Sequence, residues 1–176
     1  MPDTVSYTHL DVYKRQGKTS VGRRLAKALD ESFRDADEEI VAAAGMSIPD
    51  IFESYGEPGF RDLERRVIAR LLDEPPMVLA LGGGAFVDGD TRAVIRARGI
   101  SVWLKADLET LVTRTARKRG TRPLLEGGDP REILERLMQE RYPIYAEADH
   151  TIETGEQPPD MIVTRILELL AERHRP

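Results

Sequence analysis

Gly17-Lys18-Thr19-Ser20 matches the second half of a phosphate-binding loop, G-x-x-x-x-G-K-[ST], and runs directly into an amphipathic helix. In such a loop, backbone N–H groups and the positive end of the helix dipole point at a phosphate. The motif assigns Lys18 to the β- and γ-phosphates of a nucleotide and the Thr19 hydroxyl to Mg²⁺. The helix is predicted by apolar residues at i, i+4 and i+8, namely Val21, Leu25 and Leu29.

The first half of this motif is absent. Val12 stands where the first glycine is expected, and residues 13–16 contain no glycine. An ordinary helix start is therefore an alternative for the four-residue match.

Residues 1–16 also lack the continuous Val/Ile/Leu run of a strand that is buried on both faces. Residues 6–16, SYTHLDVYKRQ, resemble a string that precedes unrelated open reading frames as a library or assembly artefact. We therefore predict that residues 1–16 are a non-native head in place of the first strand and loop start, and that a central strand is lost. A divergent or disordered N-terminus is the alternative.

Composition indicates one globular domain. The chain has 176 residues, of which 40% are hydrophobic and 32% charged. Its net charge of −5 argues against general nucleic-acid binding, and its lack of cysteine excludes disulfides and cysteine zinc sites. No apolar run approaches the ~20 residues of a membrane span, and the first residues lack the apolar region of a secretory signal. We expect neither a membrane nor a nucleic-acid partner.

Two aspartates follow the first helix. Residues 32–37 are predicted to form a short strand whose last residues, Asp35 and Asp37, share one face because they are two apart. Paired carboxylates at a strand end suit a hydrated Mg²⁺ and a substrate hydroxyl. The alternative is a solvated acidic turn before a helix over 38–44.

Arg61 and Glu64 are three residues apart on another predicted helix, so they are neighbours on one face. One interpretation is a surface ion pair that contributes a few tenths of a kcal/mol. The other is an arginine held by a glutamate, so that its planar fork can bind a carboxylate.

The clearest buried strand, residues 77–81, ends in Gly82-Gly83-Gly84. Three glycines at the carboxyl end of a parallel strand favour a close approach of the backbone to a ligand over a plain flexible turn. Later elements are a helix over 88–98, a strand over 100–104, a helix from 129 that ends at 141–143, a strand over 150–154 and a helix from 158.

A strongly basic segment interrupts this acidic protein. Residues 114–122 contain five arginines or lysines, and Gly127-Gly128 follow. The segment is either a solvated basic face or a lid that closes over phosphates and supplies an arginine to the transferring group.

Six motifs together resemble one family. G-K-T-S, F-R-D-A-D, F-R-D-L-E, L-G-G-G, R-P-L-L and R-Y-P-I-Y occur in the order and spacing of shikimate kinase, over about residues 17–172. The resemblance implies an α/β P-loop fold of three layers, with a five-stranded parallel sheet flanked by helices and a mobile lid. It also implies a single kinase domain over 17–176, with a substrate-binding region at about 37–64 and the lid at about 115–129.

The resemblance carries residue roles onto this sequence. The implied catalytic residues are Asp37, Lys18 and Arg122. The implied shikimate ligands are Asp37, Arg61, Gly82, Gly83, Gly84 and Arg141, with Glu64 orienting Arg61. The implied ATP-binding residues are Gly17, Lys18, Thr19, Ser20, Arg114, Arg122 and Pro158. Thr19 and Asp35 are the implied Mg²⁺ ligands.

The implied reaction is ATP + shikimate → ADP + 3-phosphoshikimate, a step toward chorismate and the aromatic amino acids, with Mg²⁺ as cofactor. A monomeric, cytoplasmic enzyme is expected. Two alternatives stay open: another small-metabolite kinase, such as gluconate kinase, or a relative that binds ligand without catalysis because its phosphate loop is incomplete.

Overall fold

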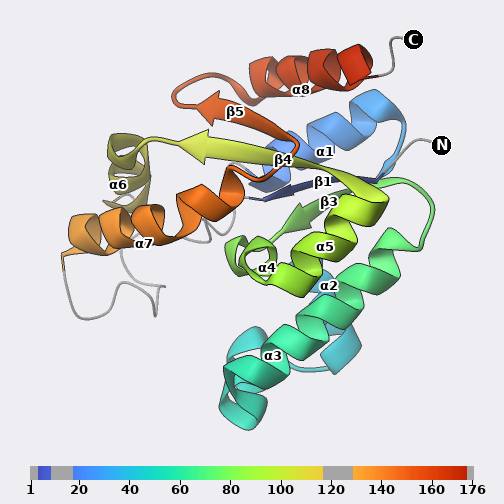
Figure 1. The fold of residues 1–176 in the computed structure, drawn as a ribbon, viewed down its shortest axis with the longest axis vertical. Coiled ribbons are helices and arrows are strands. Elements are labelled where there is room, and N and C mark those ends of the chain that lie inside the picture. Colours follow the sequence, from blue (N-terminus) through green and yellow to red (C-terminus); the bar gives the residue numbers. More distant parts are fainter. Residues whose placement is uncertain (1–3, 9–17, 117–128, 174–176) are drawn as a thin grey trace.

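The computed structural model describes residues 4–8, 18–116 and 129–173, in which strands and helices alternate along the chain (Figure 1). The strands are β1 (Thr4–Thr8), β2 (Ser32–Asp35), β3 (Met77–Leu81), β4 (Gly99–Ala106) and β5 (His150–Thr154). The helices are α1 (Lys18–Leu29), α2 (Ala36–Ala44), α3 (Ile48–Leu72), α4 (Gly83–Val87), α5 (Gly89–Arg98), α6 (Leu108–Ala116), α7 (Pro130–Tyr145) and α8 (Pro159–Arg173). Within these ranges, no helix is both long enough and apolar enough to cross a bilayer.

The strands form one five-stranded sheet of order β2-β3-β1-β4-β5, and every pairing is parallel. Their carboxyl ends therefore lie along one edge. The chain leaves β1 for α1 on one face of the sheet and leaves β3 for α4 and α5 on the other face (Figure 1). Ligands of open α/β sheets bind at such a reversal, which here lies between β1 and β3.

The central strand comes from the N-terminal head. In β1, Val5 is in register with Val78 of β3 on one side and with Ile100 of β4 on the other. The prediction that the central strand is lost is therefore wrong. Threonine, valine and tyrosine suit a pleated strand, so TVSYT can pair although it lacks a Val/Ile/Leu run. Whether this head is native stays a prediction.

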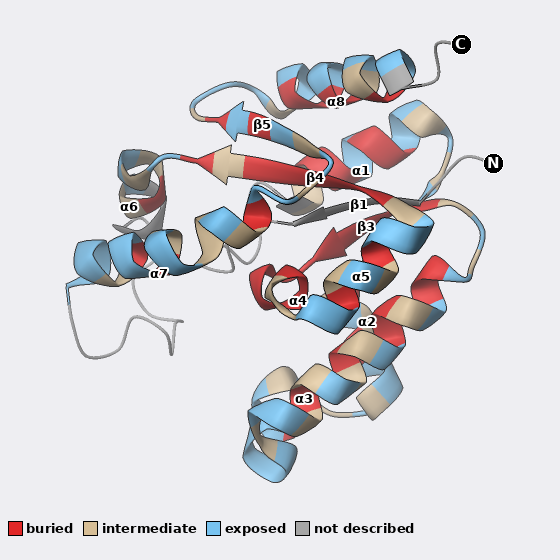
Figure 2. Ribbon diagram, in the orientation of Figure 1, coloured by how far each residue is buried: buried red, intermediate tan, exposed pale blue. Residues whose placement is uncertain are grey.

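Alternating side chains of the sheet divide the core into two halves, which gives the three predicted layers (Figure 2). Leu79 and Leu81 of β3 pack in the cluster formed with α2 to α7, whereas Val78 and Ala80 pack in the cluster formed with α1 and α8. This is the period of two expected of a strand that is covered on both faces.

One helix differs from its prediction, and another is bent. α7 continues through Pro143 to Tyr145 instead of ending at 141–143. Tyr142 and Tyr145 pack on Trp103 of β4, with ring centroids 4.8 and 5.8 Å apart, and this packing outweighs the helix-breaking tendency of proline. α3 bends at Gly56, whose φ of 66° lies in the left-handed region that favours glycine.

Candidate active site

The predicted site residues converge on the carboxyl edge of the sheet. Thr19 and Ser20 lie in the first turn of α1, Asp35 ends β2, and Gly82 follows β3. Lys18 begins α1 and Arg114 lies on α6, and for both the structure describes the backbone only. Outside the described residues lie Gly17, residues 12–16, Arg122 and residues 117–128 of the lid predicted at about 115–129.

The two aspartates are arranged differently from the prediction. β2 ends at Asp35, and Asp37 lies in the first turn of α2, so they do not share one face of a strand. Asp35 is instead the N-cap of α2, because its Oδ1 accepts a hydrogen bond from the Asp37 backbone N at 3.0 Å. An Asp two residues before an acidic first turn is a helix-start signal, and here it ended the strand early.

Arg61 has three neighbours that hold its guanidinium in place. Its Nη1 donates to Glu64 Oε2 at 2.6 Å, and its Nε lies 3.5 Å from Glu57 Oε1. A methyl group on Gly84 would come within 2.5 Å of Arg61 Nη1 and 2.7 Å of its Cζ, so the guanidinium lies directly on the glycine backbone. The Glu64 side chain is only 3% exposed. The pair is therefore a partly buried, oriented one and not the exposed surface pair of the first interpretation.

Gly82 has carboxylates close by. A methyl group there would lie 3.6 Å from Asp37 Oδ1 and 3.8 Å from Glu64 Oε1. The glycine turn, α2 and α3 thus bring Asp37 and the Glu64–Arg61 pair to one place. This arrangement suits a ligand that carries both hydroxyl and carboxylate groups, because an aspartate accepts from a hydroxyl and an arginine binds a carboxylate.

A second arginine lies on α7. Arg141 Nη1 is buried and has no hydrogen-bond partner among the described residues. Buried donors are usually paired, which makes this nitrogen a candidate donor to a ligand. On the same helix, the buried Tyr145 hydroxyl donates to the Gly83 carbonyl at 2.8 Å and ties α7 to the glycine turn.

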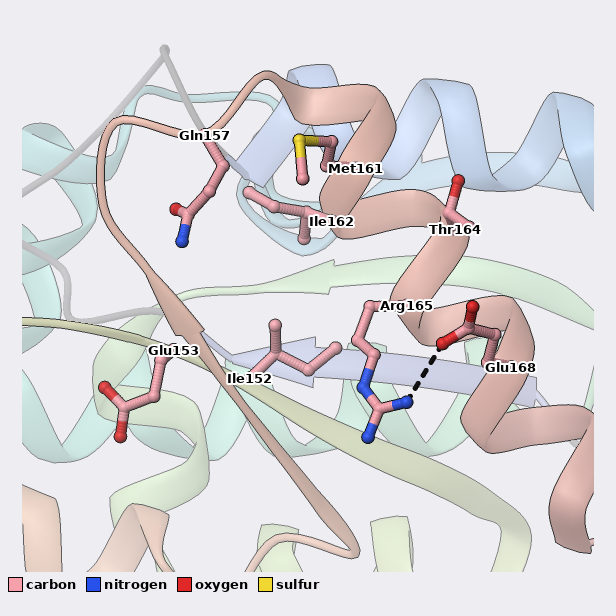
Figure 3. Close-up of a pocket in the computed structure, with 8 residues that line it drawn as sticks. All are labelled: Ile152, Glu153, Gln157, Met161, Ile162, Thr164, Arg165 and Glu168. Atoms are coloured by element: carbon pink, nitrogen blue, oxygen red, sulfur yellow. Dashed lines mark hydrogen bonds and ion pairs between the residues drawn. The ribbon is translucent and has the colours of Figure 1, made fainter.

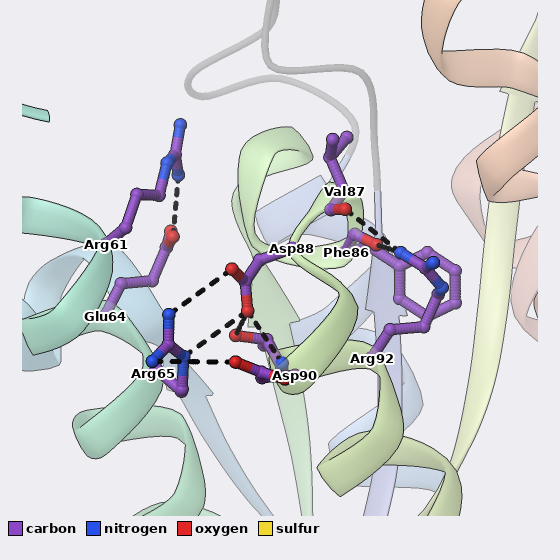
Figure 4. Close-up of polar contacts among 9 residues, drawn as sticks. Arg61, Glu64, Arg65, Phe86, Val87, Asp88, Asp90 and Arg92 are labelled. Atoms are coloured by element: carbon purple, nitrogen blue, oxygen red, sulfur yellow. Dashed lines mark hydrogen bonds and ion pairs between the residues drawn. The ribbon is translucent and has the colours of Figure 1, made fainter. Parts of the chain in front are cut away.

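Sequence reasoning missed a polar network behind the glycine turn (Figure 4). Asp88, the N-cap of α5, accepts from both the backbone N and the Oγ1 of Thr91 at 2.8 Å, and it also binds Arg65 of α3. Burial raises the pKa of Asp88, but the hydrogen bonds from Thr91 and Arg65 outweigh it and leave that pKa below the ordinary value. An Asp before an apolar helix predicts the cap, whereas nothing in the sequence indicates its partner on α3.

Pro158 lies in the loop between β5 and α8, again at the carboxyl edge. Arg24 of α1 pairs with Asp160 at the start of α8, with Nε 2.9 Å from Oδ1, which joins this loop to the helix of the phosphate motif. A groove between β5 and α8 begins beside this loop at Gln157 and continues along α8 to Glu168 (Figure 3). Most of this groove therefore extends away from the candidate site.

Fold and site together define a class: a small α/β kinase in which a helix follows the central strand and an arginine held by a glutamate lies near an aspartate. The family model described as shikimate kinase matches residues 16–171. The chain belongs to the shikimate kinase family, which confirms the resemblance carried by the six motifs.

Known shikimate kinases resemble this chain in sequence and in structure. The shikimate kinase of Caulobacter vibrioides is 58% identical over 158 residues, which cover 90% of this chain and 78% of that protein. The structure of the Acinetobacter baumannii shikimate kinase in complex with shikimate superposes with a TM-score of 0.88 at 36% identity, covering 99% of this chain and 96% of that one. A gluconokinase from Sinorhizobium meliloti shares only the fold, with a TM-score of 0.55 at 16% identity over 99% of this chain and 98% of that one.

Proposed function

We propose that this chain transfers the γ-phosphoryl group of ATP to shikimate, giving ADP and 3-phosphoshikimate. The observation that carries the proposal is the meeting of Asp37, Glu64 and Arg61 at the turn Gly82–Gly84, in a chain of this family. Arg61 and Arg141 would bind the shikimate carboxylate, and Asp37 would accept a hydrogen bond from the ring hydroxyl that reacts.

In this reaction the shikimate hydroxyl oxygen attacks the γ-phosphorus while the bond from phosphorus to the β,γ-bridging oxygen breaks. Asp37 takes the hydroxyl proton, and the leaving oxygen stays on ADP. Lys18 and Arg122 would neutralise charge on the phosphoryl oxygens. Because little covalent chemistry falls to the protein, positioning and electrostatics carry most of the rate.

Thr19 and Asp35 suit Mg²⁺ that arrives with ATP. Mg²⁺ keeps several waters and binds through one or two protein oxygens plus phosphates, so it does not need a cluster of carboxylates. When bound, the ion would offset phosphate charge.

Two other functions have less support than shikimate phosphorylation. Gluconate lacks support beyond the shared fold, because the gluconokinase likeness is only 16% identical. A ligand-binding relative without turnover remains the alternative, since Val12 and residues 13–16 break the phosphate-loop motif. A monomeric state and a cytoplasmic location stay predictions.

Shikimate-dependent ADP release by the full chain tests the proposal, with gluconate assayed alongside and circular dichroism to establish folding. We expect turnover with shikimate alone. Shikimate binding by calorimetry without ADP release would favour the non-catalytic relative, and turnover with gluconate would overturn the substrate assignment.

Gly84→Ala is expected to weaken shikimate binding while the protein stays folded. The new methyl group would displace the Arg61 guanidinium, which is the far end of a flexible side chain, so the backbone need not move. We expect the Kd for shikimate to rise about 30-fold, the order of effect of a misplaced binding group. Calorimetry measures the Kd, and Tm reports on folding.

Gly89→Ala is the matched control, because a methyl group on Gly89 meets nothing within 4 Å. Its Kd should stay at the value of the unchanged chain. Equal Kd values for the two variants would remove Arg61 from the carboxylate site.

A further inference from the structure

Arg65 joins α3 to the end of the α4 turn. Its Nε donates to Asp88 Oδ1 and its Nη2 to Asp88 Oδ2, each at 3.4 Å, so both prongs of the guanidinium engage one carboxylate (Figure 4). Arg65 lies one helical turn after Arg61, whose guanidinium lies on Gly84. Two contacts therefore join α3 to the segment 84–88. Arg61 lies on Gly84, and Arg65, four residues later, binds Asp88, four residues after Gly84.

Asp88 links Arg65 to Gly84. Its carboxylate also accepts two hydrogen bonds from Thr91, which fix it as the cap of α5. Its backbone N donates to the Gly84 carbonyl at 3.4 Å, which closes the α4 turn. A shift of the Asp88 side chain would thus move the turn on which Arg61 rests.

The opposite side of α4 is anchored toward α7, the helix that carries Arg141. Tyr145 donates to the Gly83 carbonyl at 2.8 Å. Arg92 donates from Nη1 to the carbonyls of Phe86 at 2.8 Å and Val87 at 3.0 Å, and its Nε lies 3.2 Å from Glu147 Oε2. With α4 held to α7, the distance between Arg61 and Arg141 depends on the contact between α3 and α4.

We propose that Arg65 is a positioning residue for the substrate carboxylate: its two-pronged bond to Asp88 holds the α4 turn where Gly84 seats the Arg61 guanidinium. The ligand named here, shikimate, rests on the proposed function. The Arg65 side chain is 36% exposed and that of Asp88 24%, so the pair adds little to stability. Its contribution is orientation, which a planar fork provides and a lysine does not.

Arg65→Gln tests this in the full chain, with shikimate affinity measured by calorimetry. We expect the Kd for shikimate to rise about tenfold, as a small misplacement of a binding group would cause. The Kd of the Arg65→Lys variant should lie between those of the unchanged chain and of Arg65→Gln, because a lysine keeps the charge but loses one of the two hydrogen bonds. Arg66→Gln is the matched control: Arg66 pairs only along α3 with Asp62, at 3.0 Å, in the contacts described for it, and we expect a change below about twofold.

A second measurement separates positioning from general loosening. In an Arg61→Lys background, Arg65→Gln should change the Kd by less than about twofold, because the fork that Arg65 positions is gone. A tenfold change in both backgrounds would overturn the proposal, as would equal effects of Arg65→Gln and Arg66→Gln.

A crystal structure of the Arg65→Gln variant keeps this inference separate from the proposed function. We expect the Arg61 guanidinium to have left Gly84. If Arg61 is unmoved, the positioning role is overturned even where shikimate binds. If the unchanged chain binds no shikimate, the proposed function fails and the carboxylate named here fails with it, while a moved Arg61 still supports the link from Arg65.

Discussion

Val12→Gly combined with Arg15→Gly is expected to raise kcat/KM for ATP by about 100-fold. Val12→Gly supplies the first glycine of the motif and Arg15→Gly adds a glycine inside the loop, which gives G-x-x-G-x-G-K-T over residues 12–19. Glycine lets successive backbone N–H groups point at the phosphates, and each hydrogen bond to a charged group contributes about 1.5–3 kcal/mol, so one or two regained bonds give this factor. Shikimate-dependent ADP release at varied ATP measures the effect.

Tyr13→Gly is the matched control, since it adds a glycine to the same segment without supplying the first glycine of the motif. We expect it to change kcat/KM by less than about threefold, because Val12 would still occupy the position of the first glycine. Shikimate affinity should not respond to the double change, because its proposed ligands lie on α2, α3, α7 and the glycine turn. If the unchanged chain already turns over as fast as the double variant, half of the motif suffices and the non-catalytic alternative is excluded.

Most elements after residue 18 were predictable because their boundaries carry local chemistry, but α4 was expected only as a glycine turn. Gly45 ends α2 at φ 67°, Ser47 caps α3, and the buried strand Met77–Leu81 forms as expected. Local signals failed where a tertiary contact decides the outcome. β1 forms between two strands that are distant in sequence, and α7 passes Pro143 because its tyrosines pack on Trp103.

The candidate site was predicted as a set of residues but not as an arrangement. The resemblance to the family selected Asp37, Arg61, Glu64 and the three glycines, and the structure brings these together. The sequence could not indicate that Gly84 supports Arg61 or that Arg65 reaches Asp88, because the residues of each pair are 23 positions apart. Spacing of three or four residues reports only on neighbours along one helix.

Asp37→Asn is expected to lower kcat by about 10²- to 10⁴-fold, the range for losing a general base. The side chains have nearly the same shape, and the Asp37 backbone N that donates to Asp35 Oδ1 is unchanged, so the start of α2 should persist. KM for ATP should stay within about threefold, because Asp37 contacts the hydroxyl and not the nucleotide in the proposed reaction. The substitution is best placed in the Val12→Gly/Arg15→Gly chain, where turnover is expected to be highest.

Glu38→Gln separates a role in the reaction from a change of charge. Glu38 is exposed beside Asp37 in the same first turn, so either substitution removes one negative charge from the N-terminus of α2. Such a charge contributes about 0.3–1 kcal/mol through the helix dipole, which would lower Tm similarly in both variants. Only Asp37→Asn should lower kcat, because Asp37 and not Glu38 has its carboxylate beside Gly82. Equal kcat values would show that Asp37 is not the base, and a rise confined to the shikimate Kd would make it a binding residue.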